Sequence, residues 1–526
     1  MKERKYPIGI QTFANIIEDG YLYIDKTDLV WQLAHYAKYI FMSRPRRFGK
    51  SLLTSTLESY FLGERHLFEG LKIMQLEQEW QQYAVLRLDI STAKGKDNAD
   101  ELRRALMLVL SRLPYYDGNA DEHTPGERLT GMIQRAYQQT NRQVVVIIDE
   151  YDAPLLEVLH EEENLPAYRK VMQELYVPLK ANERYIKFCF ITGITKFSQM
   201  SIFSTINNLA NVTLDPVFNN ICGITEQEIA TFMREDIQML ADTYGVSYDE
   251  MHNKLKTRYD GYHFAKNSDE LYNLFSLLKA CLHKEVANYW FESATPTYLI
   301  RQMQHFRTDI TTLDSIEMPA SAFDRPTEAM TTALPLLYQS GYLTIKGYDR
   351  ESMLYTLAIP NQEVRIGYTE GLLPIYTGLD GADVQTGFAL KFWRALKKGD
   401  PDLAMREMQT YLAGVPYVEG FKQKLKDAAT SEGFFEYTLY LIFSMLNIYV
   451  RTQVKCAGGR TDMVVWMPDT VYVFELKVND TAENALRQID DRGYAIPYRS
   501  DSRRVVKVGV RFNADTRAPE EWVIAD

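Results

Sequence analysis

Predominantly apolar runs punctuate the first 235 residues, at 39–42, 84–90, 144–148 and 186–191. Between these runs, apolar positions recur at the spacing of an amphipathic helix. Runs of this kind are typical of strands that are buried on both faces, as in a parallel sheet covered by helices. We therefore predict that residues 1–235 form one α/β domain built on a parallel sheet.

The next part of the chain, residues 236–383, has a mainly helical pattern and many aromatic side chains. Within it, a helical stretch near 333–340 precedes two strand patterns between 341 and 358, with a glycine-containing turn between them. A helix followed by a strand, a turn and a second strand suggests a winged-helix-like unit. Residues 384–429 are predicted to form a connector of two amphipathic helices, broken at Gly399-Asp-Pro401.

The pattern changes again near residue 430, where strand-like segments with β-branched and aromatic residues become frequent. We predict a helix, three strands, a second helix and a final strand, in the order αβββαβ. Their expected limits are 434–446, 448–454, 461–467, 471–478, 482–494 and 505–512. Residues 430–526 are expected to form a compact module with its own core.

The segment Ser43–Leu53 joins the first apolar run to a helical pattern and contains Gly49, Lys50 and Ser51 in succession. A strand, a tight loop and a Gly-Lys-Ser helix start are typical of nucleotide phosphate binding. The glycine lets the backbone approach the phosphates, the lysine reaches the β/γ oxygens and the serine hydroxyl ligates Mg²⁺. The usual motif has a glycine where this chain has Arg44. A basic loop that only caps a helix is the alternative interpretation.

A second part of this site is indicated by the apolar run 144–148, which ends in Asp149 and Glu150. Ligands of α/β proteins bind at the carboxyl ends of parallel strands. Asp149 is expected to hold the Mg²⁺ shell, and Glu150 to polarise the attacking water. Thr192 ends another strand pattern and could sense the γ-phosphate, although a strand with a polar end explains it almost as well. The predicted nucleotide contacts are Arg46, Arg47, Phe48, Gly49, Lys50, Ser51, Leu52, Asp149 and Thr192.

In the C-terminal module, Glu475 and Lys477 share one face of an otherwise apolar strand, because side chains alternate along a strand. Charged groups in such a place are costly unless they are paired, exposed at an edge or bound to a ligand. A hairpin turn at 468–470 can bring Asp462 beside Glu475. Two carboxylates and a lysine suit metal-dependent phosphodiester hydrolysis, with the carboxylates holding Mg²⁺ and the lysine orienting the nucleophile. An edge-strand salt bridge is the alternative.

Two further residues could complete this site. Gln488 lies on the next predicted helix and Glu436, a candidate metal ligand, on the preceding one. Taken alone, each is better explained as part of a solvated face. A basic segment near the same helix and the last strand fits a nucleic-acid backbone, although most such runs are solvated faces. Its members are Arg487, Arg492, Arg499, Arg503, Arg504, Lys507 and Arg511.

Composition narrows the class of protein. The chain has 526 residues, of which 46% are hydrophobic and 25% charged, and these values are ordinary for globular domains. The net charge of −11 argues against a protein that coats nucleic acid, although it leaves room for a local basic site. The four cysteines form no C-x-x-C pair, and there is no apolar signal region or membrane-length run. We expect a cytoplasmic chain with no membrane partner.

These motifs resemble a known family, the bacterial predicted AAA-type ATPases fused to a C-terminal PD-(D/E)XK nuclease domain. The family itself has arginine at the position of Arg44. The resemblance covers nearly the whole chain and implies a P-loop, RecA/AAA-like core, a helical lid with a winged-helix-like segment, and a restriction-endonuclease-like module. The residues that carry it are Tyr23-Ile-Asp-Lys-Thr27, Arg44-Pro-Arg-Arg-Phe-Gly-Lys-Ser51, Ile148-Asp-Glu-Tyr-Asp152, Ile191-Thr-Gly-Ile-Thr-Lys-Phe197, Tyr259-Asp-Gly-Tyr262, Gly459-Arg-Thr-Asp462, Phe474-Glu-Leu-Lys477, Gln488 and Gly493-Tyr494.

The resulting hypothesis is an ATP-regulated, Mg²⁺-dependent nuclease that acts on DNA in preference to RNA. Its catalytic residues would be Asp462, Glu475, Lys477 and Gln488, with Glu150 serving ATP hydrolysis. The rival hypothesis is a nucleotide-dependent switch whose C-terminal module binds nucleic acid or a protein without cleaving it. Whether the chain forms a homo-oligomer stays open.

Overall fold

The structure is a computed structural model, and it describes residues 4–159, 161, 163–196, 209–290, 299, 302–303, 305–306, 308, 312–326, 330–377, 382–413, 449–456, 459–478, 480–513 and 518–526. The chain divides into two compact units. The first consists mainly of residues 1–290 and 315–361, and the second mainly of residues 362–526. The four-part division expected from the sequence stays a prediction.

The first unit is built on a five-stranded sheet in the order β2-β3-β4-β1-β5, and all its strand pairs are parallel. The strands are β1 (Tyr39–Ser43), β2 (Ala84–Asp89), β3 (Val144–Asp149), β4 (Ile186–Gly193) and β5 (Ala210–Asn211). The first four coincide with the apolar runs of the sequence, and every residue of β1 and β3 is buried. The predicted parallel sheet is therefore confirmed.

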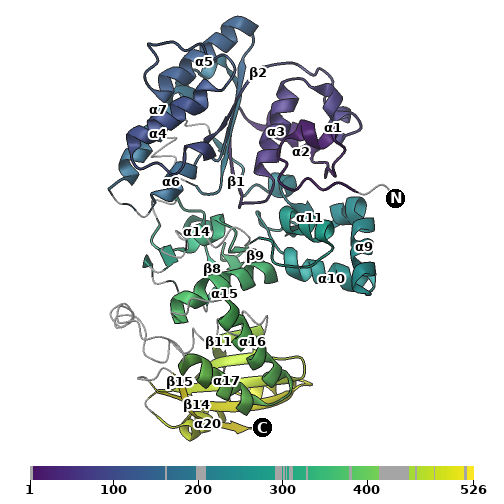
Figure 1. Ribbon diagram of the computed structural model, residues 1–526, viewed down its shortest axis with the longest axis vertical. Helices are drawn as coiled ribbons and strands as arrows, with labels where there is room; N and C mark the ends of the chain where they lie inside the picture. Colours follow the sequence, from purple (N-terminus) through teal and green to yellow (C-terminus); the bar gives the residue numbers. More distant parts are fainter. Residues whose placement is uncertain are drawn as a thin grey trace. The chain divides into compact units, whose positions relative to one another are not determined.

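Helices cover both faces of this sheet (Figure 1). On one face lie α4 (Ala99–Ser111), α5 (Pro125–Thr140) and α7 (Leu165–Ala181). On the other lie α1 (Phe13–Glu18), α2 (Thr27–Tyr36) and α3 (Lys50–Phe61). Side chains of β1 to β4 and of the first helix group form one continuous apolar core. This packing fixes the strand ends at which the candidate nucleotide site lies.

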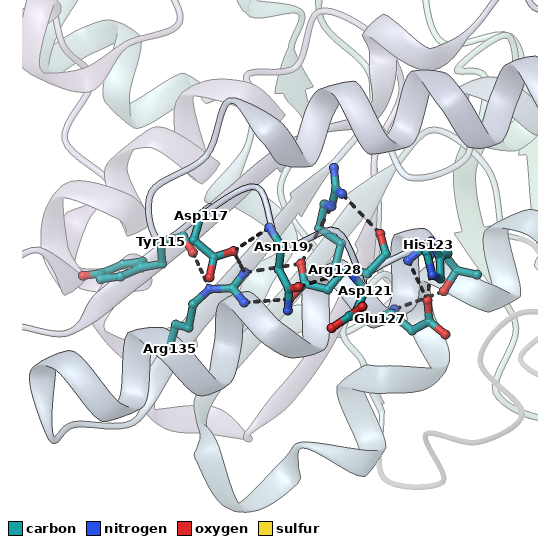
Figure 2. Close-up of polar contacts among 10 residues, drawn as sticks. Tyr115, Asp117, Asn119, Asp121, His123, Glu127, Arg128 and Arg135 are labelled. Atoms are coloured by element: carbon teal, nitrogen blue, oxygen red, sulfur yellow. Dashed lines mark hydrogen bonds and ion pairs between the residues drawn. The ribbon is translucent and has the colours of Figure 1, made fainter.

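The loop before α5 is held down by ion pairs and hydrogen bonds (Figure 2). Arg135 of α5 donates to the carbonyl of Tyr115 at 2.9 Å and to Glu122 at 2.6 Å, and its guanidinium lies 3.3 Å from Asp117. Thr124 closes the start of α5 with a capping box. Most acidic side chains of this loop are thus paired with arginine.

The remainder of the first unit consists of helices and a small sheet. The helices α9 (Arg234–Tyr244), α10 (Tyr248–Tyr259) and α11 (Leu274–His283) share an apolar core. The sheet has the order β8-β10-β9, from β8 (Ile316–Met318), β9 (Thr344–Tyr348) and β10 (Tyr355–Ala358), with α14 (Leu334–Gln339) preceding β9. The predicted helix and its two strands are present, and β8 is an additional strand that the sequence did not predict.

The second unit is built on a mixed five-stranded sheet in the order β11-β12-β13-β14-β15. Only β13 and β14 are parallel, and the helix α20 connects them. The elements are β11 (Tyr449–Cys456), β12 (Gly459–Trp466), β13 (Thr470–Lys477), α20 (Ala482–Asp491), β14 (Arg504–Asn513) and β15 (Ala518–Ala525). The predicted order αβββαβ is corrected at its end, because β15 follows the strand that was expected to be the last.

Each face of this sheet is covered by helix. On one face, Val473 packs with Ile489 and Tyr494 of the α20 region. On the other, the Tyr472 hydroxyl donates to the Leu396 carbonyl of α16 (Ala382–Lys397) at 3.1 Å. The following helix α17 (Pro401–Ala413) packs on β15. Glu475, two residues beyond Val473, therefore lies under α20. The predicted helix at 434–446 lies outside the described residues.

No helix within the described ranges is long and apolar enough to cross a lipid bilayer.

The close approach of α20 to β14 requires a glycine in that strand. A β-carbon at Gly509 would lie 2.3 Å from the Ala482 carbonyl oxygen and 2.6 Å from the Leu486 amide nitrogen. We expect Gly509→Ala to lower the free energy of unfolding of the second unit by about 2 kcal/mol, because backbone must move to admit the methyl group. Urea unfolding of the full chain, followed by tryptophan fluorescence, measures this. The control is Gly347→Ala, whose β-carbon would stand 3.4 Å from its nearest neighbour. Equal stability of the two variants would contradict the prediction.

Candidate functional site

The first candidate site begins where β1 ends. The loop 44–48 leads to Gly49, which has φ +90° and precedes α3 as its N-cap. That conformation favours glycine, because other residues rarely adopt it. No side chain caps α3, so the first amide groups of the helix remain available to an anion. This arrangement suits a phosphate group.

Arg44, which replaces the usual glycine, has a structural role. Its side chain is buried, and one terminal nitrogen donates to the carbonyls of Ser43 at 2.9 Å and Thr213 at 2.8 Å. The other terminal nitrogen donates to the Phe218 carbonyl at 2.9 Å, and the guanidinium lies 4.5 Å from the centre of the Phe264 ring. The arginine therefore ties the loop to a neighbouring segment of the same unit.

Two other residues predicted to contact a nucleotide are engaged with protein. Phe48 is buried, and its ring packs edge-on against Tyr262 at a centroid distance of 4.7 Å. Arg47 donates to the carbonyls of Tyr289 at 2.5 Å and Trp290 at 2.6 Å. Tyr259, Tyr262 and Phe264 are also buried, so the aromatic residues of this turn serve packing. Phe48 can approach a nucleotide chiefly through its backbone.

The charged residues of the site come from α3 and from the end of β3. The Lys50 ammonium donates to the carbonyls of Arg44 and Pro45, each at 3.0 Å. Burial lowers the pKa of Lys50, and the carboxylate of Asp149 opposes that shift. Asp149 is buried at the end of β3 and accepts a hydrogen bond from the Thr54 hydroxyl at 3.3 Å. The structure thus brings Lys50 and Asp149 to the same strand ends.

Glu150 follows with φ +48°, in the left-handed region that non-glycine residues rarely adopt. Burial raises the pKa of its carboxyl group, and Lys50 opposes the shift. A backbone held in this conformation beside a cavity is a common feature of functional sites. Glu150 is therefore the best placed of the acidic residues to meet a ligand.

A cavity of about 360 Å³ opens beside these residues. Six of the predicted nucleotide contacts line it, namely Arg46, Arg47, Gly49, Lys50, Ser51 and Leu52, and so does Glu150, which was expected to polarise the attacking water. Asp149, also a predicted contact, is not among its described lining residues. An adjacent apolar cavity shares Gly49 and Leu52 and is also lined by Phe48. Thr192 does not line the described part of either cavity. Its hydroxyl donates to the Met42 carbonyl at 2.7 Å, so its sensing role stays a prediction.

Sequence reasoning gave no role to Asp152, although it lies three residues beyond Asp149. The structure shows Asp152 buried and accepting hydrogen bonds from the Ile194 amide at 3.1 Å and from the Thr195 amide and hydroxyl at 2.6 Å. These bonds hold the segment after β4 against the end of β3. The acidic run Asp149-Glu-Tyr-Asp152 was the only available signal, and it did not distinguish a ligand-binding acid from a structural one.

The second candidate site lies on the β12–β13 hairpin of the second unit. Met463 pairs with Phe474 and Val464 with Val473, and continuing this register by one residue sets Asp462 opposite Glu475. Asp462 also accepts a hydrogen bond from the Leu476 amide at 2.8 Å. The two predicted carboxylates are thus adjacent across the hairpin.

Glu475 is the centre of this site. Its Oε1 atom accepts hydrogen bonds from Lys477 Nζ at 3.3 Å and from Gln488 Nε2 of α20. Its Oε2 atom is buried and has no hydrogen-bond partner among the described residues. The pKa of Glu475 is raised to about 7, by burial first and by the negative charge of Asp462 second, while Lys477 opposes the shift.

These features fit a divalent cation. A buried carboxylate oxygen without a partner is costly, and a hard cation beside two carboxylates would offset that cost. The described residues contain no group of three His, Cys, Asp or Glu side chains with metal-binding geometry. Glu436, the predicted third ligand, lies outside the described residues. The site therefore offers two carboxylates, one lysine and one amide for metal-dependent chemistry.

Several residues of the basic segment are paired with acidic residues and are therefore less available to a nucleic-acid backbone than the sequence indicates. Much of the segment forms ion pairs, Arg503 with Asp501, Arg504 with Asp526, Lys507 with Asp490 and Arg511 with Glu520. Arg487, Arg492 and Arg499 form no ion pair with a described residue. Arg487 adjoins Gln488 on α20, so it is the basic residue nearest in sequence to the candidate metal site.

The winged-helix-like segment does not present a helix for reading DNA. The residues Leu336, Leu337 and Tyr338 of α14 are all buried. A recognition helix must expose a polar face to the major groove, and α14 has none. Any nucleic-acid contact of the first unit is therefore expected elsewhere.

The fold is that of an α/β protein with a parallel sheet in its first unit and a mixed, nuclease-like sheet in its second. A family model described as predicted AAA-ATPase matches residues 7–203. A second model, of the PD-(D/E)XK nuclease superfamily, matches residues 430–522.

A protein of Azotobacter chroococcum mcd 1, described as an uncharacterized protein in the vnfD 5' region, is 32% identical over 536 residues. The alignment spans 100% of this chain and 99% of that protein. The chain thus belongs to the family of proteins with an N-terminal predicted AAA-ATPase domain and a C-terminal PD-(D/E)XK nuclease superfamily domain.

Among solved structures, the Aeropyrum pernix ORC2 protein, in ADPNP–ADP complexes, was found with 11% identity. The match covers 64% of this chain and 87% of that one, with a TM-score of 0.17. A score this low carries no argument about the fold.

The raised pKa of Glu475 predicts a pH-dependent stability in the absence of metal. The unfolded carboxyl group has its ordinary pKa near 4.5, so stability is fully present below that value and is lost as the pH rises through about 7. The loss amounts to at most about 3 kcal/mol. We expect Glu475→Gln to be more stable than wild type at pH 8.5 in EDTA, with the gap closing at pH 4.5. Urea unfolding at both pH values measures this.

Glu483→Gln is the matched control, because Glu483 is exposed on α20, the helix from which Gln488 contacts Glu475. It should follow the wild type at both pH values. A Glu475→Gln variant whose stability relative to wild type does not change with pH would contradict the assignment of the buried acid.

Proposed function

We propose that this protein is an ATP-binding, Mg²⁺-dependent nuclease that hydrolyses DNA phosphodiester bonds under control of the bound nucleotide. The main support for metal-dependent cleavage is the environment of Glu475. A buried carboxylate oxygen of Glu475 has no partner among the described residues, and Asp462, Lys477 and Gln488 lie around the same carboxylate. The unpaired oxygen belongs to a carboxylate that has a second one, Asp462, beside it, and this combination favours a bound cation over a salt bridge that serves only stability.

The residues of the module have distinct parts in this proposal. Asp462 and Glu475 would hold Mg²⁺, which lowers the pKa of a bound water and neutralises charge on the phosphate. The Lys477 ammonium would donate to the phosphate oxygens as negative charge develops. Gln488 keeps the Glu475 carboxylate oriented through its hydrogen bond. Glu436 stays a predicted third ligand.

The residues of the first unit suit ATP as the bound nucleotide. The loop 44–49 and the uncapped start of α3 would hold the phosphates, with Lys50 and Ser51 beside them. Asp149 would lie in the Mg²⁺ shell, and Glu150 would accept a proton from the attacking water. The proposed architecture is a P-loop AAA-like core with a helical lid, a winged-helix-like segment and a restriction-endonuclease-like module.

Lys477→Ala and Asp462→Ala should each lower DNA cleavage by at least about 100-fold, because each removes a group that contacts the developing charge or the cation. The assay uses supercoiled plasmid, linear duplex, single-stranded DNA and RNA, each with and without ATP and Mg²⁺. The control is Lys398→Ala, an exposed lysine at the end of α16. If both active-site variants cleave as fast as this control, the assigned site is wrong.

The rival function is a nucleotide-dependent switch that binds nucleic acid or a protein without cleavage. It gains support from the described part of the C-terminal site, which has two carboxylates instead of three. It predicts DNA binding that persists in EDTA and no metal-dependent product on any of the four substrates. Fluorescence anisotropy with labelled DNA, run beside the cleavage assay, separates the two functions.

Lys50→Ala should weaken ATP binding by about 10- to 100-fold, because a charge-assisted hydrogen bond to phosphate contributes a few kcal/mol. Isothermal titration calorimetry measures the dissociation constant. Nuclease activity without ATP should remain, and the response to ATP should disappear. Wild-type affinity in this variant would exclude the loop as the nucleotide site, whatever the nuclease result.

A further inference from the structure

The three arginines of the loop 44–48 are held in different ways. Arg44 is buried and donates to three backbone carbonyls. Arg47 donates to the carbonyls of Tyr289 and Trp290, and its guanidinium lies 4.2 Å from the centre of the Phe275 ring. Both side chains therefore fix the loop. Their guanidinium groups are held by these contacts and do not move toward a bound phosphate.

Arg46 differs from both. It is exposed, and it forms no hydrogen bond or ion pair with any residue that the structure describes. It lines the same cavity as Lys50, Ser51 and Glu150. A positive charge here adjoins the residues assigned to the terminal phosphate and to the attacking water.

The neighbours of Arg46 restrict its backbone. Pro45 has a fixed φ, and Arg47 holds φ +66° with its side chain tied down. Arg44 anchors the other side of Pro45. The loop thus presents Arg46 from a fixed backbone, so little ordering of the main chain is needed for its guanidinium to meet a phosphate.

We infer that Arg46 is a catalytic residue for ATP hydrolysis, an arginine supplied from within the loop to stabilise the transition state. The inference rests on the proposed ATP-binding function. In the step concerned, the water oxygen bonds to the γ-phosphorus and the bond from that phosphorus to the β–γ bridging oxygen breaks. The electron pair leaves with ADP, and the water proton passes to Glu150. The Arg46 guanidinium donates to the phosphoryl oxygens on which negative charge is spread.

This role separates Arg46 from Lys50. A group that binds the phosphates equally in the ground state and the transition state changes affinity alone, whereas a group used in the transition state changes kcat. Arg46→Ala should therefore lower the kcat of ATP hydrolysis by about 100-fold or more. It should leave the dissociation constant of ADP within about threefold of wild type.

The experiment measures ATP turnover and, by calorimetry, the affinities for ADP and for ADP with aluminium fluoride, which mimics the transferred phosphoryl group. Wild type should bind ADP with aluminium fluoride more tightly than ADP, and Arg46→Ala should lose that difference. Arg46→Lys should restore it only in part, because an ammonium lacks the planar fork. Arg65→Ala is the matched control, since Arg65 is exposed and has no ion pair with a described residue.

The outcomes are distinguishable. If wild type does not bind ATP, the proposed function itself fails and the inference with it. If wild type hydrolyses ATP and Arg46→Ala does so at the same rate, only the inference is overturned. A variant that loses ADP and aluminium fluoride binding equally would make Arg46 a ground-state anchor, which also overturns it. So would a wild type that binds ATP but gains nothing from aluminium fluoride.

Discussion

The candidate nucleotide site depends on how the loop after β1 satisfies buried positive charge. Arg44 and Lys50 are both buried, and their side-chain hydrogen bonds to described residues all go to backbone carbonyls and none to a carboxylate. Charged groups in this setting are costly unless donors and acceptors match closely. The carbonyls of the loop and of the segment around Phe218 are thereby held at fixed positions. The first amide groups of α3, which no side chain caps, can then receive an anion.

The same loop shares a packing partner with the small sheet of the first unit. Phe48 packs against Tyr262, whose hydroxyl donates to the Gly341 carbonyl at 3.2 Å. Lys346 of β9 donates to the Gly261 carbonyl at 2.6 Å. A dense packing of this kind transmits small displacements, because its side chains have few alternative positions. The turn at 259–264 therefore connects the loop after β1 with the sheet β8-β10-β9, and a displacement of one is expected to move the other.

In the second unit the buried charge is negative, and it belongs to Glu475. Glu475 has a lysine and an amide on one oxygen and no described partner on the other. Burial and the charge of Asp462 together favour its protonated form. Such a group costs stability in the folded protein and is retained where it binds something. The two units thus hold charge in sites of opposite sign, each suited to a different part of one proposed reaction scheme.

The fold could be predicted from sequence where periodicity was strong. Apolar runs located β1 to β4, and alternation located β12 and β13, because burial on both faces or on one face leaves a regular pattern. The strand β15 was missed, since Pro519, Glu520 and Glu521 interrupt its apolar pattern at a sheet edge. The short strand β8 has three residues and carries too little pattern to be recognised.

The sequence by itself determined which chemical groups are available, because Gly49, Lys50 and Ser51, and Asp462, Glu475 and Lys477, are residue sets typical of phosphate and metal binding. Only the tertiary structure decided how each candidate is employed. It engaged Arg44 and Phe48 in packing and paired much of the basic segment with acids, while Arg46 and one oxygen of Glu475 have no partner in the part of the chain that the structure describes. The reason is physical. A motif fixes which groups are present, whereas hydrogen bonds and burial depend on neighbours that are distant in the chain.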